Sequence, residues 1–266
     1  LAAETEEFVR RAAPHTGSGP FIVQLAGREP EFMRIGAQLA EAAGADIIDI
    51  NMGCPAKRVT GGQSGCALMR EPGLARALIT AAVTAVSVPV TVKMRLGWDD
   101  DSLNAPEIAR IAEGEGAQML TVHGRTRNQF YEGRADWSRI APVVQSVSLP
   151  VIANGDIEDE ASAREALAQS GAAGVMIGRG AVGRPWRPAE IANAIYGSPY
   201  RAPTQDEKLQ AMLDQIADSV ALYGEKLGVR VVRKHIAAFV DAWCEDAGRE
   251  PMPDARIALC RLDSPT

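Results

Sequence analysis

The sequence predicts an α/β fold, a (β/α)8 barrel followed by a small helical domain, and three observations support this fold class. Short runs rich in Val and Ile alternate with helical patterns, which is typical of parallel strands joined by helices. At 266 residues the chain is long enough for a barrel-sized domain with a small appendage. Repetition of the βα unit along the chain favours a barrel over an open dinucleotide-binding sheet. About six βα units are visible where a barrel has eight, so we expect two N-terminal strands to be absent from this chain.

The expected elements follow one another along the chain. Strands are expected at residues 21–25, 46–51, 88–95, 119–123, 151–153 and 174–177. Helices are expected at residues 1–13, 30–43, 71–86, from 104 onward, 137–147 and 158–170. Gly44 should end one helix, and Asn104 with Glu107 should form a capping box on another. The strands are read as apolar up to a polar C-terminal tip, which predicts a sheet covered on both faces.

The pattern changes after Pro199, where long helical stretches at 205–224 and 229–246 follow without strands. They carry a strip of basic residues: Lys226, Arg230, Arg233, Lys234 and His235. This part is either a small basic domain or a helical cap packed on the barrel. We expect a catalytic barrel domain over 1–198 and a helical domain over 199–266. Three prolines predict a loosely ordered tail over 248–266.

Composition excludes several classes of protein. No apolar stretch is long enough to span a bilayer, and four scattered cysteines without a CxxC pair predict neither a zinc site nor a disulfide scaffold. A reducing, cytoplasmic setting is expected. The net charge of −6 argues weakly against a nucleic-acid partner. However, the acids concentrate in the expected helices, whereas arginines follow the expected strands. This distribution predicts one basic face; the alternative is that these arginines are ordinary solvated side chains. They are Arg58, Arg95, Arg125, Arg127, Arg179 and Arg184.

The strand ends carry the candidate chemistry. Cys54, held between Gly53 and Pro55 after an apolar strand, is either a catalytic thiol or a small buried hydrophobe. Lys93 alone could be a surface lysine, and His123 alone a satisfied core histidine. A barrel, however, brings all strand tips into one ring. The polar or glycine-bearing tips are Gln24, Asn51, Lys93 with Arg95, His123 with Arg125, Asn154-Gly155-Asp156 and Gly178-Arg179.

The last two tips predict a phosphorylated ligand. Glycine-bearing turns after the final two strands of a barrel bind phosphate through main-chain N–H groups, as Asn154–Asp156 and Gly178–Gly180 would. Lys93 would lie near an anionic reduced ring, and Gln24 would offer a paired donor and acceptor. This pattern suits FMN, with a phosphosugar as the competing occupant.

Five motifs in order resemble those of the tRNA-dihydrouridine synthases, specifically the bacterial B-type branch. They are Asn51-Met52-Gly53-Cys54-Pro55-Ala56-Lys57, Val90 to Arg95, His123-Gly124-Arg125-Thr126, Asn154-Gly155-Asp156-Ile157 and Ile177-Gly178-Arg179. The resemblance implies an FMN enzyme that reduces a tRNA uridine to 5,6-dihydrouridine with NADPH as reductant. It implies Cys54 as proton donor, and Asn51 and Arg95 at the substrate. It implies FMN contacts from Gln24, Lys93, His123, Asn154, Gly155, Asp156, Gly178 and Arg179.

The reaction calls for an acid at the thiol. Reduction of the uracil double bond needs hydride at C6, from the reduced flavin, and a proton at C5. An ordinary cysteine, with a pKa of ~8.5, is protonated at neutral pH, so we predict that Cys54 is a thiol at rest and that Cys66 only packs. Two alternatives stay open: a flavin-dependent dehydrogenase of free pyrimidines, of the dihydroorotate type, and a non-catalytic RNA-binding fragment. We expect a monomer that binds tRNA, without a metal or a membrane.

Overall fold

The structure is a computed structural model and describes residues 19–262 and 264. The helix expected over residues 1–13 lies outside the described residues. Within the described part, the chain divides into two compact units. The first holds residues 19–157 and 161–177, and the second holds 158–160, 178–262 and 264. Each unit is described by itself.

The first unit contains one six-stranded sheet in which every neighbouring pair is parallel. The strands pair in the order in which they occur in the sequence, as in a (β/α) barrel, whereas a doubly wound sheet reverses its order. The strand positions predicted from the sequence are confirmed to within two residues at each end. The strands are β1 (Ile22–Leu25), β2 (Ile47–Met52), β3 (Val90–Arg95), β4 (Met119–His123), β5 (Val151–Asn154) and β6 (Gly174–Met176).

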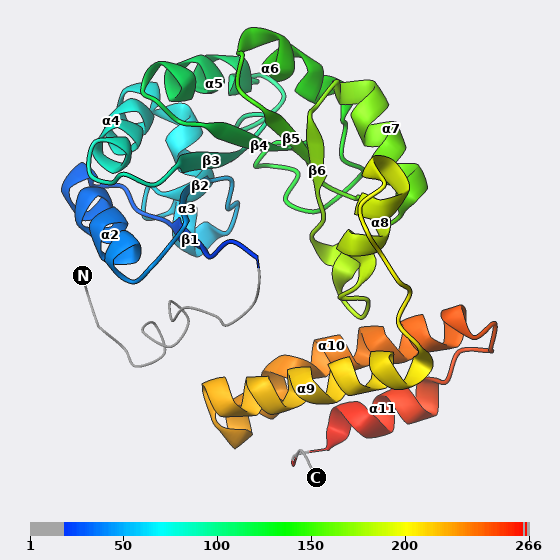
Figure 1. The fold of residues 1–266 in the computed structure, drawn as a ribbon. Coiled ribbons are helices and arrows are strands. Elements are labelled where there is room, and N and C mark those ends of the chain that lie inside the picture. The colour runs from blue at the N-terminus through cyan, green and yellow to red at the C-terminus, as the bar shows by residue number, and fades with distance from the viewer. Residues whose placement is uncertain (1–18, 263, 265–266) are drawn as a thin grey trace. The chain divides into compact units, whose positions relative to one another are not determined.

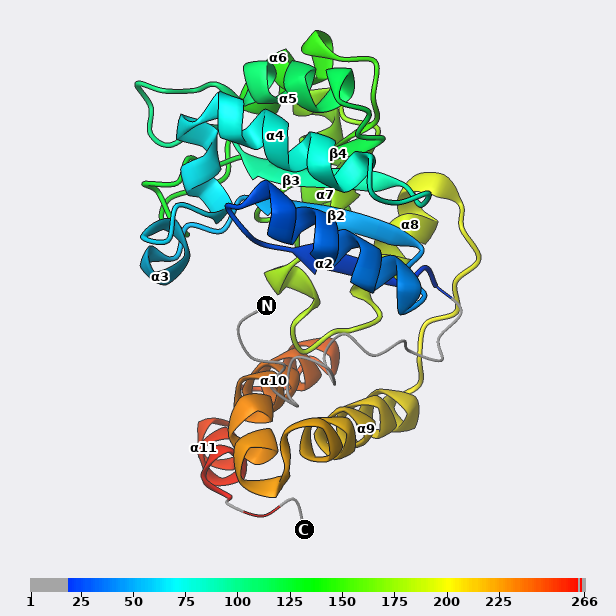
Figure 2. The ribbon, with the colours of Figure 1, turned by 90° about the vertical axis from the view of Figure 1, so that its left-hand side faces the viewer.

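Helices line the outer side of this curved sheet (Figure 1). Neighbouring helices pack on one another, as α2 and α4 do side by side in Figure 2. Gly44 ends α2 as predicted, with a φ of +92° that favours glycine. The helical segments of this unit are α2 (Pro30–Ala42), α3 (Lys57–Thr60), η1 (Gly65–Arg70), α4 (Pro72–Val83), α5 (Ala105–Gly114), η2 (Ser138–Ile140), α6 (Ala141–Ser146) and α7 (Glu160–Ser170).

The two faces of the sheet differ in chemistry, which corrects the expectation of strands that are polar only at their tips. One face of β2 and β3 carries Ile48, Ile50, Val92 and other buried apolar residues. The opposite face is polar well before the strand ends: Asp49 pairs in register with Gln24 and Thr91. Because residues alternate between faces along a strand, the helices cover the apolar residues only. The other face forms a polar lining.

Two local predictions are wrong. Asn104 makes no side-chain cap on α5; its amide instead donates to the main-chain oxygen of Met69 at 2.6 Å, and so ties this loop to η1. The helix expected over 137–147 is split into η2 and α6, with Pro142 in the first turn of α6. A proline offers no N–H for a continuing helix, and fits best at a helix start.

The second unit contains a helical bundle with its own core. Its elements are η3 (Arg179–Ala181), α8 (Arg187–Tyr196), α9 (Gln205–Tyr223), α10 (Glu225–Asp246) and α11 (Pro253–Arg261). Trp186 packs on the buried cluster of Met212, Val232 and Phe239. The boundary predicted between 198 and 199 therefore falls inside this unit. A capping box that the sequence analysis missed, Thr204 with Glu207, begins α9.

The expectation of a loose tail is wrong for α11. Pro253 lies in its first turn, where a proline is pre-organised for the helix. The helix packs on α10, and the guanidinium of Arg233 donates to the main-chain oxygen of Leu262 at 3.0 Å. A proline that suggested disorder in fact starts a helix.

Candidate active site

The predicted site residues of the first unit meet on the polar face of the sheet. In register, Asn51 pairs with Lys93, and Arg95 with His123. His123 in turn pairs with Asn154 on β5. Paired residues of parallel strands lie on the same face, so these side chains form one continuous surface at the carboxyl ends of the strands. Chemistry in barrel enzymes takes place at this end.

Asn51 fixes the loop that carries Cys54. Its side-chain oxygen accepts hydrogen bonds from the main-chain N–H of Gly53 at 3.1 Å and of Cys54 at 2.9 Å. Its amide nitrogen donates to the side-chain oxygen of Gln24 at 2.8 Å. The turn is therefore closed by a side chain on the strand itself, as in an Asx turn. Cys54 is held in one place while remaining partly exposed.

Arg95 holds the same loop from the next strand. Its Nε donates to the main-chain oxygen of Gly53 at 2.9 Å, and its Nη1 donates to that of Thr126 at 2.8 Å. The side chain is 2% exposed, and its guanidinium lies over the ring of Tyr131. Arg95 thus connects the loops after β2 and β4. A direct contact between Arg95 and a substrate stays a prediction.

Asp49 was not singled out from the sequence, yet it organises the β1–β2–β3 part of the site. Its two carboxylate oxygens accept from Gln24 at 2.6 Å and from Thr91 at 2.7 Å. Burial raises the pKa of this carboxyl, and both hydrogen bonds act in the opposite direction. The Asp49 network fixes the side chain of Gln24, which in turn orients Asn51. The sequence signal that could have predicted Asp49 is its position two residues before Asn51, which places both side chains on the same face of the strand.

Lys93 and Asn154 form a second link across the site. The ammonium of Lys93 donates to the side-chain oxygen of Asn154 at 3.1 Å, and the Asn154 amide donates to the main-chain oxygen of Met176 at 2.8 Å. Burial, and then the nearby charge of Arg95, lower the pKa of Lys93. Positive charge is therefore concentrated here, which suits an anionic ligand.

His123 is held as a neutral imidazole. Its Nε2 lies 3.2 Å from Nη1 of Arg125, and because a guanidinium can only donate, Nε2 accepts and the proton is on Nδ1. Burial and the charges of Arg95, Lys93 and Arg125 lower its pKa to about 3. Gly155, at a φ of +109°, passes close to this ring: a Cβ there would lie 2.9 Å from Nε2. Only a glycine at position 155 leaves room for the ring of His123.

His123 should make the folded chain less stable in mild acid. Its pKa is about 3 in the folded chain, against an unfolded value of ~6.5. Between these values the unfolded chain binds a proton that the folded chain does not, so the stability present above pH ~6.5 is lost as the pH falls. Urea unfolding of wild type and His123→Gln should differ in pH slope by up to ~1.4 kcal/mol per pH unit near pH 5. Equal pH slopes of the unfolding free energy in the two proteins would contradict the lowered pKa of His123.

Buried Arg125 and partly exposed Asp156 form an ion pair between the tips of β4 and β5. Arg125 is 1% exposed, and its Nη1 donates to Oδ1 of Asp156 at 2.9 Å while Nη2 donates to Oδ2. Asp156 also accepts the main-chain N–H of Ala135 at 2.8 Å. The expected basic face is therefore wrong for Arg95 and Arg125, because both are buried and bind loop carbonyls or a carboxylate.

The remaining predicted residues lie elsewhere. Cys66 is fully buried in η1, and burial raises its pKa to about 12, so it stays a thiol and packs. Its N–H donates to the main-chain oxygen of Cys54 at 3.0 Å. Gly178 and Arg179 follow β6 but belong to the second unit, at the start of η3. Their part in a shared site stays a prediction.

Among residues 19–262 and 264, no group of three His, Cys, Asp or Glu side chains is arranged to hold a metal ion. No helix in the described part of the chain is both long enough and apolar enough to cross a membrane.

Comparison with known proteins identifies the family. The sequence model of the dihydrouridine synthase family matches residues 1–250. A probable tRNA-dihydrouridine synthase of Rhodobacter capsulatus is 51% identical over 98% of this chain and 82% of its own length. A probable tRNA-dihydrouridine synthase of Rhizobium leguminosarum is 51% identical over 92% of this chain and 78% of its own. The tRNA-dihydrouridine synthase B of Xanthomonas axonopodis is 43% identical over 93% and 77%. This chain belongs to the dihydrouridine synthase family.

Proposed function

We propose that this chain reduces a uridine of tRNA to 5,6-dihydrouridine, with Cys54 as the proton donor. The observation that carries the proposal is the Cys54 loop, held by Asn51 and Arg95 at the carboxyl end of the sheet beside a cluster of positive charge. Membership of the dihydrouridine synthase family supports this substrate, and so do the relatives, which are named as tRNA-dihydrouridine synthases.

FMN fits the donor set of the polar face. Gln24 offers an amide, Lys93 an ammonium group, and Asn154 an amide, from three strands of one surface. The charges of Lys93 and Arg95, from one strand of this face, suit an anionic flavin and its phosphate. The residues assigned to FMN are Gln24, Lys93, His123, Asn154, Gly155 and Asp156 in the first unit, with Gly178 and Arg179 in the second. Bound FMN, reduced by NADPH, supplies the hydride equivalent for C6 of the uracil.

The residues of this chain supply the proton and the geometry. Cys54 delivers its thiol proton to C5, and its loop is kept in place by the two main-chain hydrogen bonds to Asn51 and by Arg95 on Gly53. Neutral His123 offers its Nδ1–H as a donor that keeps the same protonation state across the working pH range. Preorganisation of this kind lowers the cost of bringing the acid to the reacting carbon.

The target base lies within a folded RNA, so it has to leave its stack to reach Cys54, at a cost of a few kcal/mol. Binding energy from other parts of the tRNA offsets that cost. Lys226, Arg230 and Lys234 are exposed on α10 and spaced along one side of the helix, so we assign them to the tRNA backbone. A cytoplasmic monomer is the working form that we propose.

Incubation of the chain with FMN, NADPH and tRNA that lacks dihydrouridine tests the proposal. We expect mass spectrometry of the digested tRNA to show dihydrouridine, and free uracil and dihydroorotate to be unchanged. Turnover of the free pyrimidines alone would favour the dihydroorotate-type dehydrogenase. A colourless protein that shifts tRNA on a gel but forms no dihydrouridine would favour the RNA-binding fragment. Either result rejects the proposed reaction.

A further inference from the structure

Two guanidinium groups lie over one tryptophan ring in the loops that follow the strands. The guanidinium carbon of Arg70 is 4.9 Å from the centroid of the Trp98 ring, and that of Arg127 is 4.6 Å from it. Arg127 also lies over the ring of Phe130, at 4.6 Å. We call these four residues the arginine–aromatic cluster. Attraction between each cation and the ring offsets part of the repulsion between the two cations.

The positive charge of the cluster is not neutralised. Elsewhere in the unit, exposed arginines pair with acids, as Arg76 does with Glu115 and Arg139 with Asp100. Arg70 and Arg127 have no carboxylate partner among the residues that the structure describes. The Nε of Arg127 is buried, and within the same residues it has no hydrogen-bond partner. The guanidinium of Arg127 donates to the side chains of Asn128 at 3.2 Å and Thr60 at 3.4 Å, which are neutral. Two guanidinium groups without a carboxylate partner, on an aromatic platform, attract an anion that can also stack.

The cluster adjoins the Cys54 loop. Gly97, next to Trp98, accepts the main-chain N–H of Arg127 at 2.9 Å and the thiol of Cys66 at 3.8 Å. The main-chain N–H of Cys66 donates to the oxygen of Cys54. Two hydrogen bonds of Cys66 therefore link the Gly97–Trp98 loop to the main chain of Cys54. Cys54, Trp98 and Arg127 follow β2, β3 and β4, so the cluster and Cys54 lie on neighbouring loops at the same end of the sheet.

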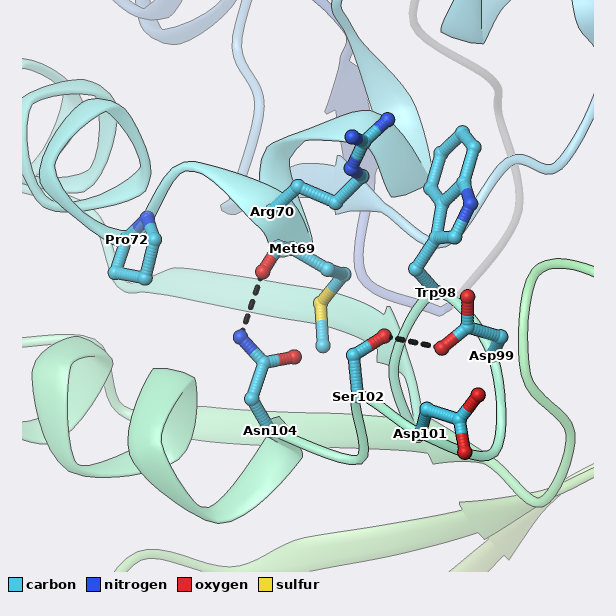
Figure 3. Close-up of a pocket in the computed structure, with 8 residues that line it drawn as sticks. All are labelled: Met69, Arg70, Pro72, Trp98, Asp99, Asp101, Ser102 and Asn104. Atoms are coloured by element: carbon cyan, nitrogen blue, oxygen red, sulfur yellow. Dashed lines mark hydrogen bonds between the residues drawn. The ribbon is translucent and has the colours of Figure 1, made fainter.

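A cavity of about 570 Å³ opens beside the cluster (Figure 3), which is within the ~300–1,000 Å³ usual for ligand sites. Figure 3 shows Arg70 of η1 and Trp98 of the next loop side by side, with Asp99 next to Trp98 and with Ser102 and Asp101 below them. Ser102 donates to Asp99 at 2.6 Å. The carboxylates repel a phosphate, so an RNA backbone in this cavity is held on the arginine side.

We infer that the arginine–aromatic cluster binds the phosphodiester backbone next to the uridine that enters the active site. The inference rests on the proposed function and deepens it by naming a contact for the RNA in the first unit. Arg70 is exposed and free to form a bidentate contact with a phosphate. Trp98, half-buried, keeps that guanidinium oriented, and Arg127 adds a second charge behind it.

Binding of fluorescently labelled tRNA to the Arg70→Gln variant tests the inference, with Arg110→Gln as the control. Both changes remove one exposed positive charge, but Arg110 lies on α5 of the outer helical layer. We expect the Kd of Arg70→Gln to rise about fivefold to tenfold at low salt, and the slope of log K against log salt to fall by about 0.7. Arg110→Gln should stay within about twofold of wild type, and thermal unfolding checks that both variants fold.

Equal affinity and equal salt slope in the two variants would overturn the inference. A titration with polyglutamate distinguishes RNA from an acidic protein: an equal loss of affinity for both polyanions in Arg70→Gln would overturn recognition of RNA. Failure of the proposed function can be distinguished from failure of this inference, because in that case the wild-type protein forms no dihydrouridine. Dihydrouridine formed equally by wild type and Arg70→Gln at limiting tRNA would leave the function standing and reject the backbone contact.

Discussion

Replacing Cys54 with alanine is expected to lower the turnover of dihydrouridine formation by about 10²–10⁴-fold, the range in which a positioned acid contributes. The variant retains the polar face of the sheet, so it should bind FMN and tRNA as wild type does. Asn51 contacts the main chain of Cys54, so the loop keeps its hydrogen bonds when the side chain is shortened. Single-turnover kinetics of prereduced enzyme measure the loss at the chemical step.

Cys66→Ala is the matched control, because it removes the other thiol of the same region. Cys66 is fully buried, so its thiol is out of reach of a base in the active site, and burial raises its pKa to about 12, which makes it a weaker acid. We expect nearly full turnover and a loss of stability of about 1 kcal/mol from the vacated space. Equal losses of turnover in the two variants, or an active Cys54→Ala enzyme, would remove Cys54 from its assigned role.

The sequence predicted the order of the sheet and the edge at which the polar tips meet, since both follow from local patterns. Val- and Ile-rich runs mark strands, and Asn51, Lys93 and His123 each fall at the end of such a run. Parallel pairing then brings them to one edge without further information. This part of the site depends only on where strands alternate with helices along the sequence and on the parallel pairing of the strands.

The parts that the sequence did not predict depend on long-range partners. Asp49 and Thr91 form their hydrogen bond across two strands that are 42 residues apart in the sequence. Arg95 is buried because carbonyls of two loops, at Gly53 and Thr126, satisfy its guanidinium. The sequence around Arg95 does not distinguish it from the solvent-exposed arginines that are usual in proteins. Only the folded loops supply the acceptors.

The Arg125–Asp156 pair gives the largest expected effect on stability. Arg125 is 1% exposed, and its three side-chain nitrogens donate to Asp156, to Glu132 and Gly133 carbonyls, and to His123. Asp156→Asn keeps the shape of the side chain but leaves a buried guanidinium without an anion. Removing one partner of a buried pair costs about 3–5 kcal/mol, because the other charge stays desolvated. We expect the melting temperature to fall by roughly 10 °C.

Asp100→Asn provides the control, because it removes the same charge from an exposed pair. Its partner Arg139 is 43% exposed, and a surface pair contributes less than about 1 kcal/mol. Thermal and urea unfolding of both variants measure the difference. A melting temperature of Asp156→Asn within about 2 °C of that of Asp100→Asn would show that the buried pair does not hold the strand tips. Arg125 contacts both Asp156 and His123, which we assign to FMN. Asp156→Asn should therefore also retain FMN less well than wild type, whereas Asp100→Asn should not.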